Sequence, residues 1–340
     1  MENSRLTRTV PAEWAEHRAM WVGFPSHGDL WEENLAPAQA EVAALTRALA
    51  GPGGERVRLF VRGDEAEAQA RALLDGVPHI EFVRGQFGDV WLRDTGPIFV
   101  VDGEAQLTGV GFHFNGWGGK YILEDDDAVA EQLAAAAGAP LEQHAFVVEG
   151  GALDHDGAGT ILTTRQCLLN PNRNADWTEA EAEQAMQNAL GARRLLWLGD
   201  GLLNDHTDGH VDNLARFVAP GVVACPVAWG RDDPNGAVYD ETARRLGEMR
   251  TERGASLTVV RVASPGRVEV DGNVVPASHM NFVIANKAVV VPLYTNDRAG
   301  QFAMDALASL FPEREVIGLP SNALLSGGGS FHCITQQEPA

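Results

Sequence analysis

Four turn signals at regular intervals constrain the fold of this chain more than any other feature. Asp102-Gly103, Asp156-Gly157, Pro220-Gly221 and Asn286-Lys287 each separate two apolar runs, so each predicts a β-hairpin. The turns are roughly 55, 63 and 66 residues apart, which leaves room for a helix and a further strand in each interval. The sequence therefore predicts a structural repeat of hairpin, helix and single strand.

The expected elements follow from apolar periodicity and capping residues. The predicted hairpins pair 89–101 with 105–114, 145–153 with 160–168, 209–218 with 222–227, and 279–285 with 288–294. Helices are expected over 64–74, 126–137, 178–190, 240–250 and 297–310. Thr178 is expected to cap the third of these helices, which should end at Gly191.

Two strands are left over, one at 19–24 and one at Cys333 near the C-terminus. Their pairing would complete a fifth unit and close a ring, and closure would remove exposed sheet edges. An open mixed α/β sheet is the alternative. Since no Gly- or Ser-rich linker divides the chain, residues 1–340 are expected to form one domain.

The charge of the chain limits its partners. The 340 residues include 26 Lys and Arg against 47 Asp and Glu, a net charge of −21. Such a field repels nucleic acid and anionic membranes and attracts a small cation, although acidity also serves solubility. The segment 1–5 has no signal-peptide character, and no apolar run approaches the ~18 residues of a membrane helix. We therefore expect a cytoplasmic setting.

Three cysteines, Cys167, Cys225 and Cys333, do not make a disulfide framework, and the absence of CxxC argues against structural zinc. Cys333 follows Gly327-Gly328-Gly329, where glycine leaves room for close approach, and it precedes residues that favour a strand. It is either a buried structural thiol or a nucleophile. Cys167 and Cys225 fall within predicted strands and are expected to be structural.

The segment His206-Thr207-Asp208-Gly209-His210-Val211-Asp212 is a candidate partner of the thiol. If 207–217 is extended, its alternating polar side chains share one face. The cluster then suits acid/base catalysis, a metal site or a plain polar strand face, and the sequence leaves all three open.

Carboxylates recur about eight residues before the predicted turns. Asp94, Glu149 and Asp212 occupy this position in the first three units, and Ser278 occupies it in the fourth. Equivalent strand starts in a ring converge on its axis, so these side chains would form a negative pocket. Asp94 could instead pair with Arg93, and Glu149 could simply end a strand before a glycine turn.

Two aromatic residues accompany these carboxylates. Trp91 precedes Asp94 and would form an apolar wall of the pocket. Trp117 lies in the glycine-rich loop 114–120, which lacks phosphate-binding spacing and is either a substrate-covering loop or a turn.

Taken together, the segments 91–97, 114–120, 149–151, 207–213 and 327–337 resemble the agmatine deiminase family, relatives of the peptidylarginine and arginine deiminases. The resemblance runs from Pro11 to Gln337 and implies a five-bladed α/β propeller (pentein). It implies a small cationic guanidine substrate and no metal or organic cofactor. It is also compatible with a homo-oligomer.

The resemblance also implies roles for the candidate residues. Asp94 and Asp212 would hold the guanidinium, Cys333 would attack its carbon, His210 would transfer protons, and Glu149 would orient His210. Further substrate-binding candidates are Trp91, Trp117, Asp208 and Gly328.

The chain departs from the family pattern at His206, where relatives carry an acidic residue, and at Phe24-Pro25-Ser26-His27, in place of Trp-Pro-x-Arg. Asp208 or Asp205 is the substitute for ammonium recognition. The alternatives are a peptidyl-arginine or free-arginine deiminase, a metal-dependent hydrolase and a non-catalytic binding module.

Overall fold

The strands of the computed structural model, which describes residues 8–340, form five main sheets and one short hairpin. In four sheets the first strand is antiparallel to the second, and the second is parallel to the third. These sheets comprise β4 (Ile98–Val101), β5 (Leu107–His113) and β6 (Leu141–Val147); β7 (Asp154–His155), β8 (Thr160–Thr164) and β9 (Arg194–Leu198); β10 (Arg216–Ala219), β11 (Val222–Val227) and β12 (Thr258–Ala263); and β15 (Val283–Ile284), β16 (Ala288–Leu293) and β17 (Glu315–Pro320).

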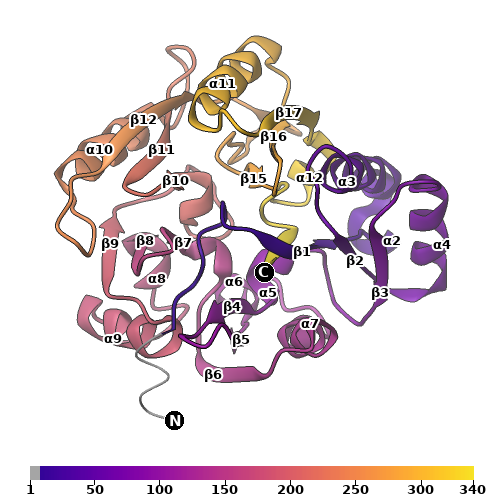
Figure 1. Cartoon of the computed structure of the whole chain (residues 1–340). Helices are drawn as coiled ribbons and strands as arrows, with labels where there is room; N and C mark the ends of the chain where they lie inside the picture. The colour runs from indigo at the N-terminus through magenta and orange to yellow at the C-terminus, as the bar shows by residue number, and fades with distance from the viewer. Residues whose placement is uncertain (1–7) are drawn as a thin grey trace.

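The fifth sheet joins the two ends of the chain. It contains β18 (Thr335–Pro339), β1 (His17–Gly23), β2 (Val57–Val61) and β3 (Ile80–Arg84). β18 is antiparallel to β1, and β1 is parallel to β2, so the plan of the other sheets is kept with its first strand supplied by the C-terminus. The predicted pairing of the terminal strands and all four hairpin turns are confirmed. Figure 1 shows the sheets around a common centre, while hydrogen bonding links them into no single closed sheet within residues 8–340.

The long helices lie on the outside of the sheets (Figure 1). They are α3 (Leu35–Ala50), α4 (Gly63–Leu73), α7 (Val129–Ala137), α9 (Glu179–Leu190), α10 (Gly236–Glu248) and α11 (Asp297–Leu310). The predicted cap of α9 is confirmed as a capping box of Thr178 and Glu181, and Gly191 ends the helix at φ 71°. The sequence reading missed α3, an alanine-rich helix that packs against the fifth sheet.

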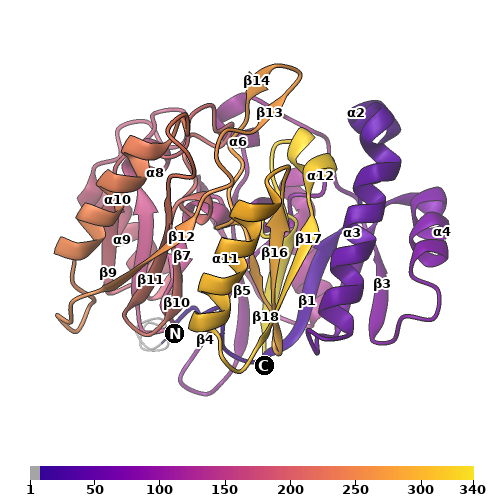
Figure 2. The same ribbon diagram turned by 90° about the horizontal axis from the view of Figure 1, so that it is seen from above.

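Short helical segments connect the strands. They are α2 (Gly28–Trp31), η1 (Glu32–Asn34), α5 (Leu92–Thr95), α6 (Gly116–Gly119), η2 (Asp126–Ala128), η3 (Gly150–Ala152), α8 (Arg165–Leu168), η4 (Val211–Asn213) and α12 (Asn322–Ser326). Figure 2 places α2, α6, α12 and the β13 (Glu269–Val270)–β14 (Asn273–Val274) hairpin at one edge of the molecule, opposite the chain ends. No helix within the described residues 8–340 has the length and apolar character needed to cross a membrane.

Several predicted strands are shorter than expected. Segment 89–97 turns through α5 before β4 begins, segment 145–153 ends the strand of the preceding sheet, and 209–215 includes η4. In each of these segments the expected carboxylate lies outside the strands, with Asp94 in α5, Glu149 directly before η3 and Asp212 in η4. Segment 1–5, which is not expected to be a signal peptide, lies outside the described residues.

Candidate active site

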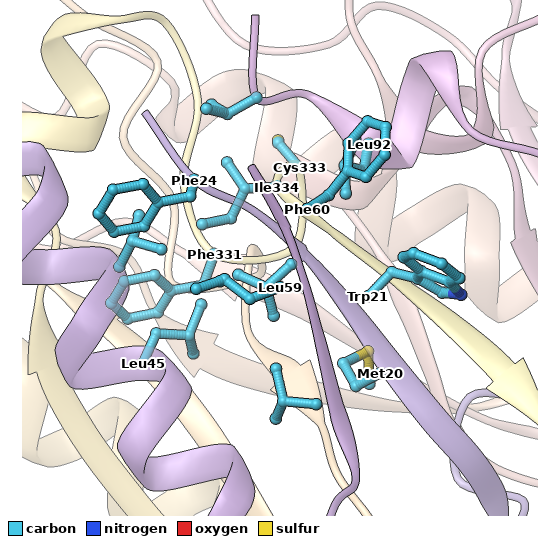
Figure 3. Close-up of a cluster of buried hydrophobic side chains, with 14 of the residues drawn as sticks. Met20, Trp21, Phe24, Leu45, Leu59, Phe60, Leu92, Phe331, Cys333 and Ile334 are labelled. Carbon is cyan, nitrogen blue, oxygen red and sulfur yellow. The ribbon is translucent and has the colours of Figure 1, made fainter. Parts of the chain in front are cut away.

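Cys333 lies in a turn directly before β18 and is 6% exposed. Phe331 and Ile334 are completely buried in the hydrophobic cluster of Figure 3, which fixes this turn. The side-chain amide of Asn281 donates to Sγ at 3.1 Å, and Oδ2 of Asp212 lies 3.8 Å from the same sulfur. Burial and the neighbouring carboxylates raise the pKa of the thiol well above its ordinary value. A cation bound beside it would therefore favour the thiolate.

Arg93 ties α5 to the turn that carries the thiol. Its Nη1 donates to the side-chain oxygens of Gln336 and Gln337 at 2.6 and 2.7 Å. Its backbone N–H donates to the carbonyl of Cys333 at 3.1 Å. Arg93 therefore forms hydrogen bonds with the C-terminal segment and not with Asp94. Asp94 is left free to bind other groups in the site.

Asp94 and Asp212 converge on one point. Oδ1 of Asp94 accepts the backbone N–H of Gly151 at 2.9 Å, and Oδ2 accepts the indole N–H of Trp117 at 2.9 Å. Oδ2 of Asp212 accepts a hydrogen bond from Nδ1 of His332 at 2.8 Å. A β-carbon on Gly151 would lie 2.8 Å from Asp94 Oδ1 and 3.1 Å from Asp212 Oδ2. Two carboxylates placed in this way suit the N–H fork of a planar cation.

The two carboxyl groups differ in their proton affinity. Burial raises the pKa of Asp94, and the nearby carboxylates Asp212 and Glu149 raise it further. Burial acts in the same direction on Asp212, but the hydrogen bond and charge of His332 outweigh it and lower its pKa. Asp212 is therefore the more firmly ionised of the pair.

His210 lies between two carboxylates. Its Nδ1 is 3.7 Å from Asp94 and its Nε2 is 3.8 Å from Glu149, and neither nitrogen has a hydrogen-bond partner among the described residues. Burial opposes a charge on the imidazole, but the charge of Asp94 and the contacts with Cys167 and Glu149 outweigh burial and raise its pKa well above the ordinary value. His210 is therefore disposed to carry a proton in the resting site.

Arg173, which the sequence reading did not single out, links Glu149 to Asp208. Its side chain is 1% exposed; Nε donates to Glu149 at 2.6 Å and Nη1 to Asp208 at 2.6 Å. Burial opposes ionisation of Glu149, but His210 and Arg173 outweigh it and lower its pKa. The oxygens of Asp208 accept further bonds from Lys120 and Asn172 at 2.6 and 2.9 Å. Its charge is thus compensated within the protein.

The expectation that 207–217 is extended is wrong. Residues 205–209 form turns, and 211–213 form η4 before β10 begins at Arg216. A strand cannot form earlier because Asp208 has φ 62° and Gly209 has φ 87°, which reverse the chain. His210 and Asp212 still reach the same centre, whereas Asp208 turns toward Arg173 and His206 toward Tyr121.

The sequence suggested a metal site in segment 206–212, but the structure brings together a different set of possible metal ligands. Glu149, Cys167 and His210 offer ligand atoms within 4.8 Å of one another, and all three are buried. Cys167 lies on α8 rather than in a strand, with Sγ 4.0 Å from Glu149. Arg173 already neutralises Glu149 there, which disfavours a further cation. The fourth unit contributes no carboxylate, since Ser278 donates to the carbonyl of Asn213 at 2.7 Å.

A cavity of about 240 Å³ opens onto Cys333 and Asp94. Trp91, Trp117, His206 and Gly328 line it, as do Leu30, Trp31, Asp89, Tyr121, Leu123, Thr207, Ser326, Gly327 and Gly329. Trp91, which was expected to form an apolar wall of the pocket, is among these lining residues. Gly328 has φ 107°, and a β-carbon there would lie 3.1 Å from Nδ1 of His206, so this position requires glycine.

The glycine-rich loop 114–120 contributes Trp117 to the lining of this cavity. Asn115 accepts the N–H of Gly118 at 2.8 Å, and Trp117 takes φ 53° so that its indole reaches Asp94. Lys120 donates to the carbonyl of His206 at 2.8 Å. The loop thus contributes to the cavity through Trp117, and its role as a cover over the substrate stays a prediction.

A second layer of polar residues, which the sequence did not predict, lies behind Asp212. His332 bridges Asp212 and Glu13, with 3.1 Å from Nε2 to Glu13. Glu13 also pairs with the buried Arg216, which contacts Asp154 at 2.7 Å. The His332-Cys333 neighbourhood was a signal for the first of these residues, but Glu13 lies 319 positions away and gave none.

Comparisons with known proteins identify the family of this chain. The family model for Porphyromonas-type peptidyl-arginine deiminase matches residues 9–339. The chain is 38% identical over 357 residues to the agmatine deiminase of Stutzerimonas stutzeri, covering 97% of this chain and 95% of that protein.

Solved structures of agmatine deiminases are also similar to this chain. The agmatine deiminase of Enterococcus faecalis, described as catalysing its reaction, has a TM-score of 0.93 at 30% identity and covers 99% of this chain and 97% of its own. A cysteine-to-serine variant of the C. jejuni agmatine deiminase with substrate bound has a TM-score of 0.89 at 25% identity, covering 98% of this chain and 96% of its own.

Proposed function

Because this chain belongs to the Porphyromonas-type peptidyl-arginine deiminase family, we propose that it hydrolyses agmatine to N-carbamoylputrescine and ammonia. One observation carries the proposal. The cavity ends at a buried thiol, Cys333, next to carboxylates that converge where a guanidinium would bind. Its product is a precursor of putrescine, which places the reaction in arginine degradation and polyamine synthesis.

Asp94 and Asp212 hold the guanidinium from two sides by charge-assisted hydrogen bonds. The bound cation offsets the carboxylate charges that keep Cys333 protonated, so the thiol loses its proton only once substrate is in place. This gating protects the nucleophile from other electrophiles. It also explains why a cysteine with a raised pKa is suited to this reaction.

The thiolate then attacks the guanidinium carbon and forms a C–S bond. His210 donates its proton to the nitrogen that departs, the C–N bond breaks and ammonia leaves, which gives an S-alkylthiouronium. His210 next takes a proton from water, whose oxygen attacks the same carbon. Expulsion of the Cys333 thiolate and transfer of the remaining hydroxyl proton to that sulfur leave the neutral ureido product and restore the thiol. The proton that the thiol first released to solvent is matched by the ammonia, which leaves the reaction as ammonium.

Glu149 and Arg173 position His210. Glu149 faces Nε2 at 3.8 Å and is held by the ion pair to Arg173, so the imidazole is confined between two carboxylates. Trp117 holds Asp94, and Trp91 and Gly328 bound the cavity. Asp208 supports the site by its pairs with Lys120 and Arg173 rather than through the cavity wall.

The lining favours an amine over a carboxylate at the far end of the substrate. Asp89 and Asp94 line the cavity, whereas no Lys or Arg is among the described residues that do. The α-carboxylate of free arginine would therefore meet negative charge without a counterion. This supports agmatine over arginine.

We further propose that residues 1–340 form one pentein domain whose five sheets are the blades of a propeller, joined through β1 and β18. The repeated order of antiparallel and parallel pairs supports this architecture. The three free, buried cysteines support a reducing, cytoplasmic setting.

Ammonia release from agmatine, free arginine and a peptidyl-arginine, measured with EDTA present for wild type and Cys333→Ser, tests the proposal. Release from agmatine alone, lost in the variant, is expected. Release from another guanidine would keep the chemistry and change the substrate. Folded protein that releases no ammonia from any of them would overturn the proposed function.

A further inference from the structure

Asp89 is a buried carboxylate with no cationic partner among residues 8–340. It is 6% exposed, lines the cavity, and forms no ion pair with any described residue. Its oxygens accept the indole N–H groups of Trp31 at 2.9 Å and Trp91 at 2.7 Å. Burial raises its pKa to about 6, so it is largely ionised at neutral pH. Two neutral donors do not balance a buried negative charge, and a cation is missing from this end of the cavity.

The backbone around Asp89 is fixed. Oδ1 of Asp126 accepts the N–H groups of Gly88 and Asp89 at 2.7 and 3.1 Å. Asp126 is itself 1% exposed, and Oδ2 has no hydrogen-bond partner among the described residues. Burial raises the pKa of Asp126 to about 7, so this neighbour carries only part of a negative charge at neutral pH and supplies no cation to Asp89.

Trp91 separates Asp89 from the reacting thiol. A β-carbon placed on Gly329 would lie 2.5 Å from Cζ3 of Trp91 and 3.1 Å from Cβ of Cys333, so the benzene edge of the indole lies beside the nucleophile. The opposite edge carries Nε1, which donates to Asp89. A substrate lying along this indole would thus have its guanidinium at Cys333 and its other end at Asp89.

We propose that Asp89 binds the terminal ammonium of the substrate and so determines the choice of an amine-ended guanidine. The inference deepens the proposed function and rests on it. The tetramethylene chain lies along Trp91, and the ammonium supplies the counterion that Asp89 lacks. The Trp31 and Trp91 rings, 6.1 Å apart and tilted by 31°, add electron-rich faces suited to a cation.

The other polar groups near the cavity are less suited to this role. His206 presents an imidazole, which attracts an ammonium far less than a carboxylate does. Asp208, the substitute expected from the sequence, is already paired with Lys120 and Arg173. Of the two carboxylates on the cavity wall, Asp94 is next to the reacting centre, which leaves Asp89 for the distal amine.

The test compares agmatine with n-butylguanidine, which has the same chain without the amine. Asp89→Asn keeps the shape and one of the two acceptor oxygens but removes the charge. We expect the preference for agmatine, as the ratio of the two kcat/KM values, to fall about 10- to 100-fold, mainly through KM. The kcat/KM for n-butylguanidine should change no more than about twofold, since it does not reach Asp89 with a charge.

Asp125→Asn is the matched control. It removes one negative charge from the same region but outside the cavity lining, where Asp125 lies 3.4 Å from Arg62. It should retain the wild-type preference. Titration calorimetry of both ligands in a Cys333→Ser background gives the same ratio from binding alone, so slow turnover of n-butylguanidine does not prevent the comparison.

The outcomes distinguish a failure of the proposed deiminase function from a failure of the role proposed for Asp89. If wild type neither binds nor hydrolyses either guanidine, the proposed function fails. If wild type prefers agmatine and folded Asp89→Asn keeps that preference, the role of Asp89 is overturned while the deiminase reaction stands. An equal loss of kcat/KM for both ligands would also overturn the role of Asp89, because Asp89 would then shape the cavity and not bind the amine.

Discussion

Gly151 lies directly against the imidazole of His210. A β-carbon at this position would come within 2.6 Å of Nδ1, a distance that real β-carbons do not adopt, and within 2.8 Å of Asp94 Oδ1. The backbone N–H of Gly151 also donates to Asp94. One glycine therefore sets the spacing between the base and a carboxylate of the site.

Gly151→Ala is expected to displace His210 and Asp94 and to lower kcat for agmatine by about 100-fold or more, since misplacement of about 1 Å has an effect of this size. Gly247→Ala is the control. Gly247 lies in α10, where an added β-carbon meets no atom within 4 Å, so this change should leave kcat intact and stabilise the helix by about 0.5–1 kcal/mol. Steady-state kinetics with thermal unfolding distinguishes the two, and normal turnover by Gly151→Ala would contradict the geometry described above.

The thiolate of Cys333 should appear only at alkaline pH in the free protein. Because its pKa is raised, the thiol stays protonated as pH rises through the ordinary range and ionises above it. The ultraviolet thiolate absorbance of wild type minus Cys333→Ser reports this step, and the contribution of Cys225 cancels in the difference. A bound amidinium such as benzamidine should move the midpoint to lower pH. A thiolate already present at neutral pH without a cation would argue against substrate-assisted ionisation.

Trp117→Phe should weaken the site through Asp94. The change removes the indole N–H that donates to Oδ2 and retains an aromatic ring over the cavity. A hydrogen bond to a charged group contributes about 1.5–3 kcal/mol, so kcat/KM for agmatine should fall about 10- to 100-fold. Trp197→Phe, which loses a comparable 3.0 Å bond to Glu183 far from the cavity, should keep kcat/KM within about twofold. Equal effects of the two changes would remove Trp117 from the mechanism.

Arg173→Met should destabilise the protein more than any exposed arginine substitution. The side chain of Arg173 is 1% exposed and pairs with Glu149 and Asp208, so its loss removes the ion-pair partner of the buried Glu149 and costs about 3–5 kcal/mol. Arg244→Met breaks exposed pairs with Glu241 and Glu248 and should cost about 0–1 kcal/mol. Urea unfolding of the two variants measures the difference. Similar midpoints would show that the Arg173 pairs add little to stability.

Local chemistry in the sequence was sufficient to predict much of this protein. The hairpin turns, the N-cap at Thr178 and the pairing of β1 with β18 depend on residues close in the chain or on edges that must be covered. The candidate residues Cys333, His210, Asp94, Asp212 and Glu149 were also recognisable, because polar groups at the start of apolar runs are costly unless they serve a purpose.

The sequence alone could not predict the contacts between distant segments or the backbone path of the turns. Alternation predicted one polar face for 206–212, but positive φ angles at Asp208 and Gly209 send its side chains in different directions. Asp89, Arg173 and Glu13 had no local signature, since their roles depend on partners that are distant in the sequence. Residue type fixed which groups were available for chemistry, whereas tertiary packing fixed which charges were compensated and which remained for a substrate, because charge compensation is a property of spatial neighbours.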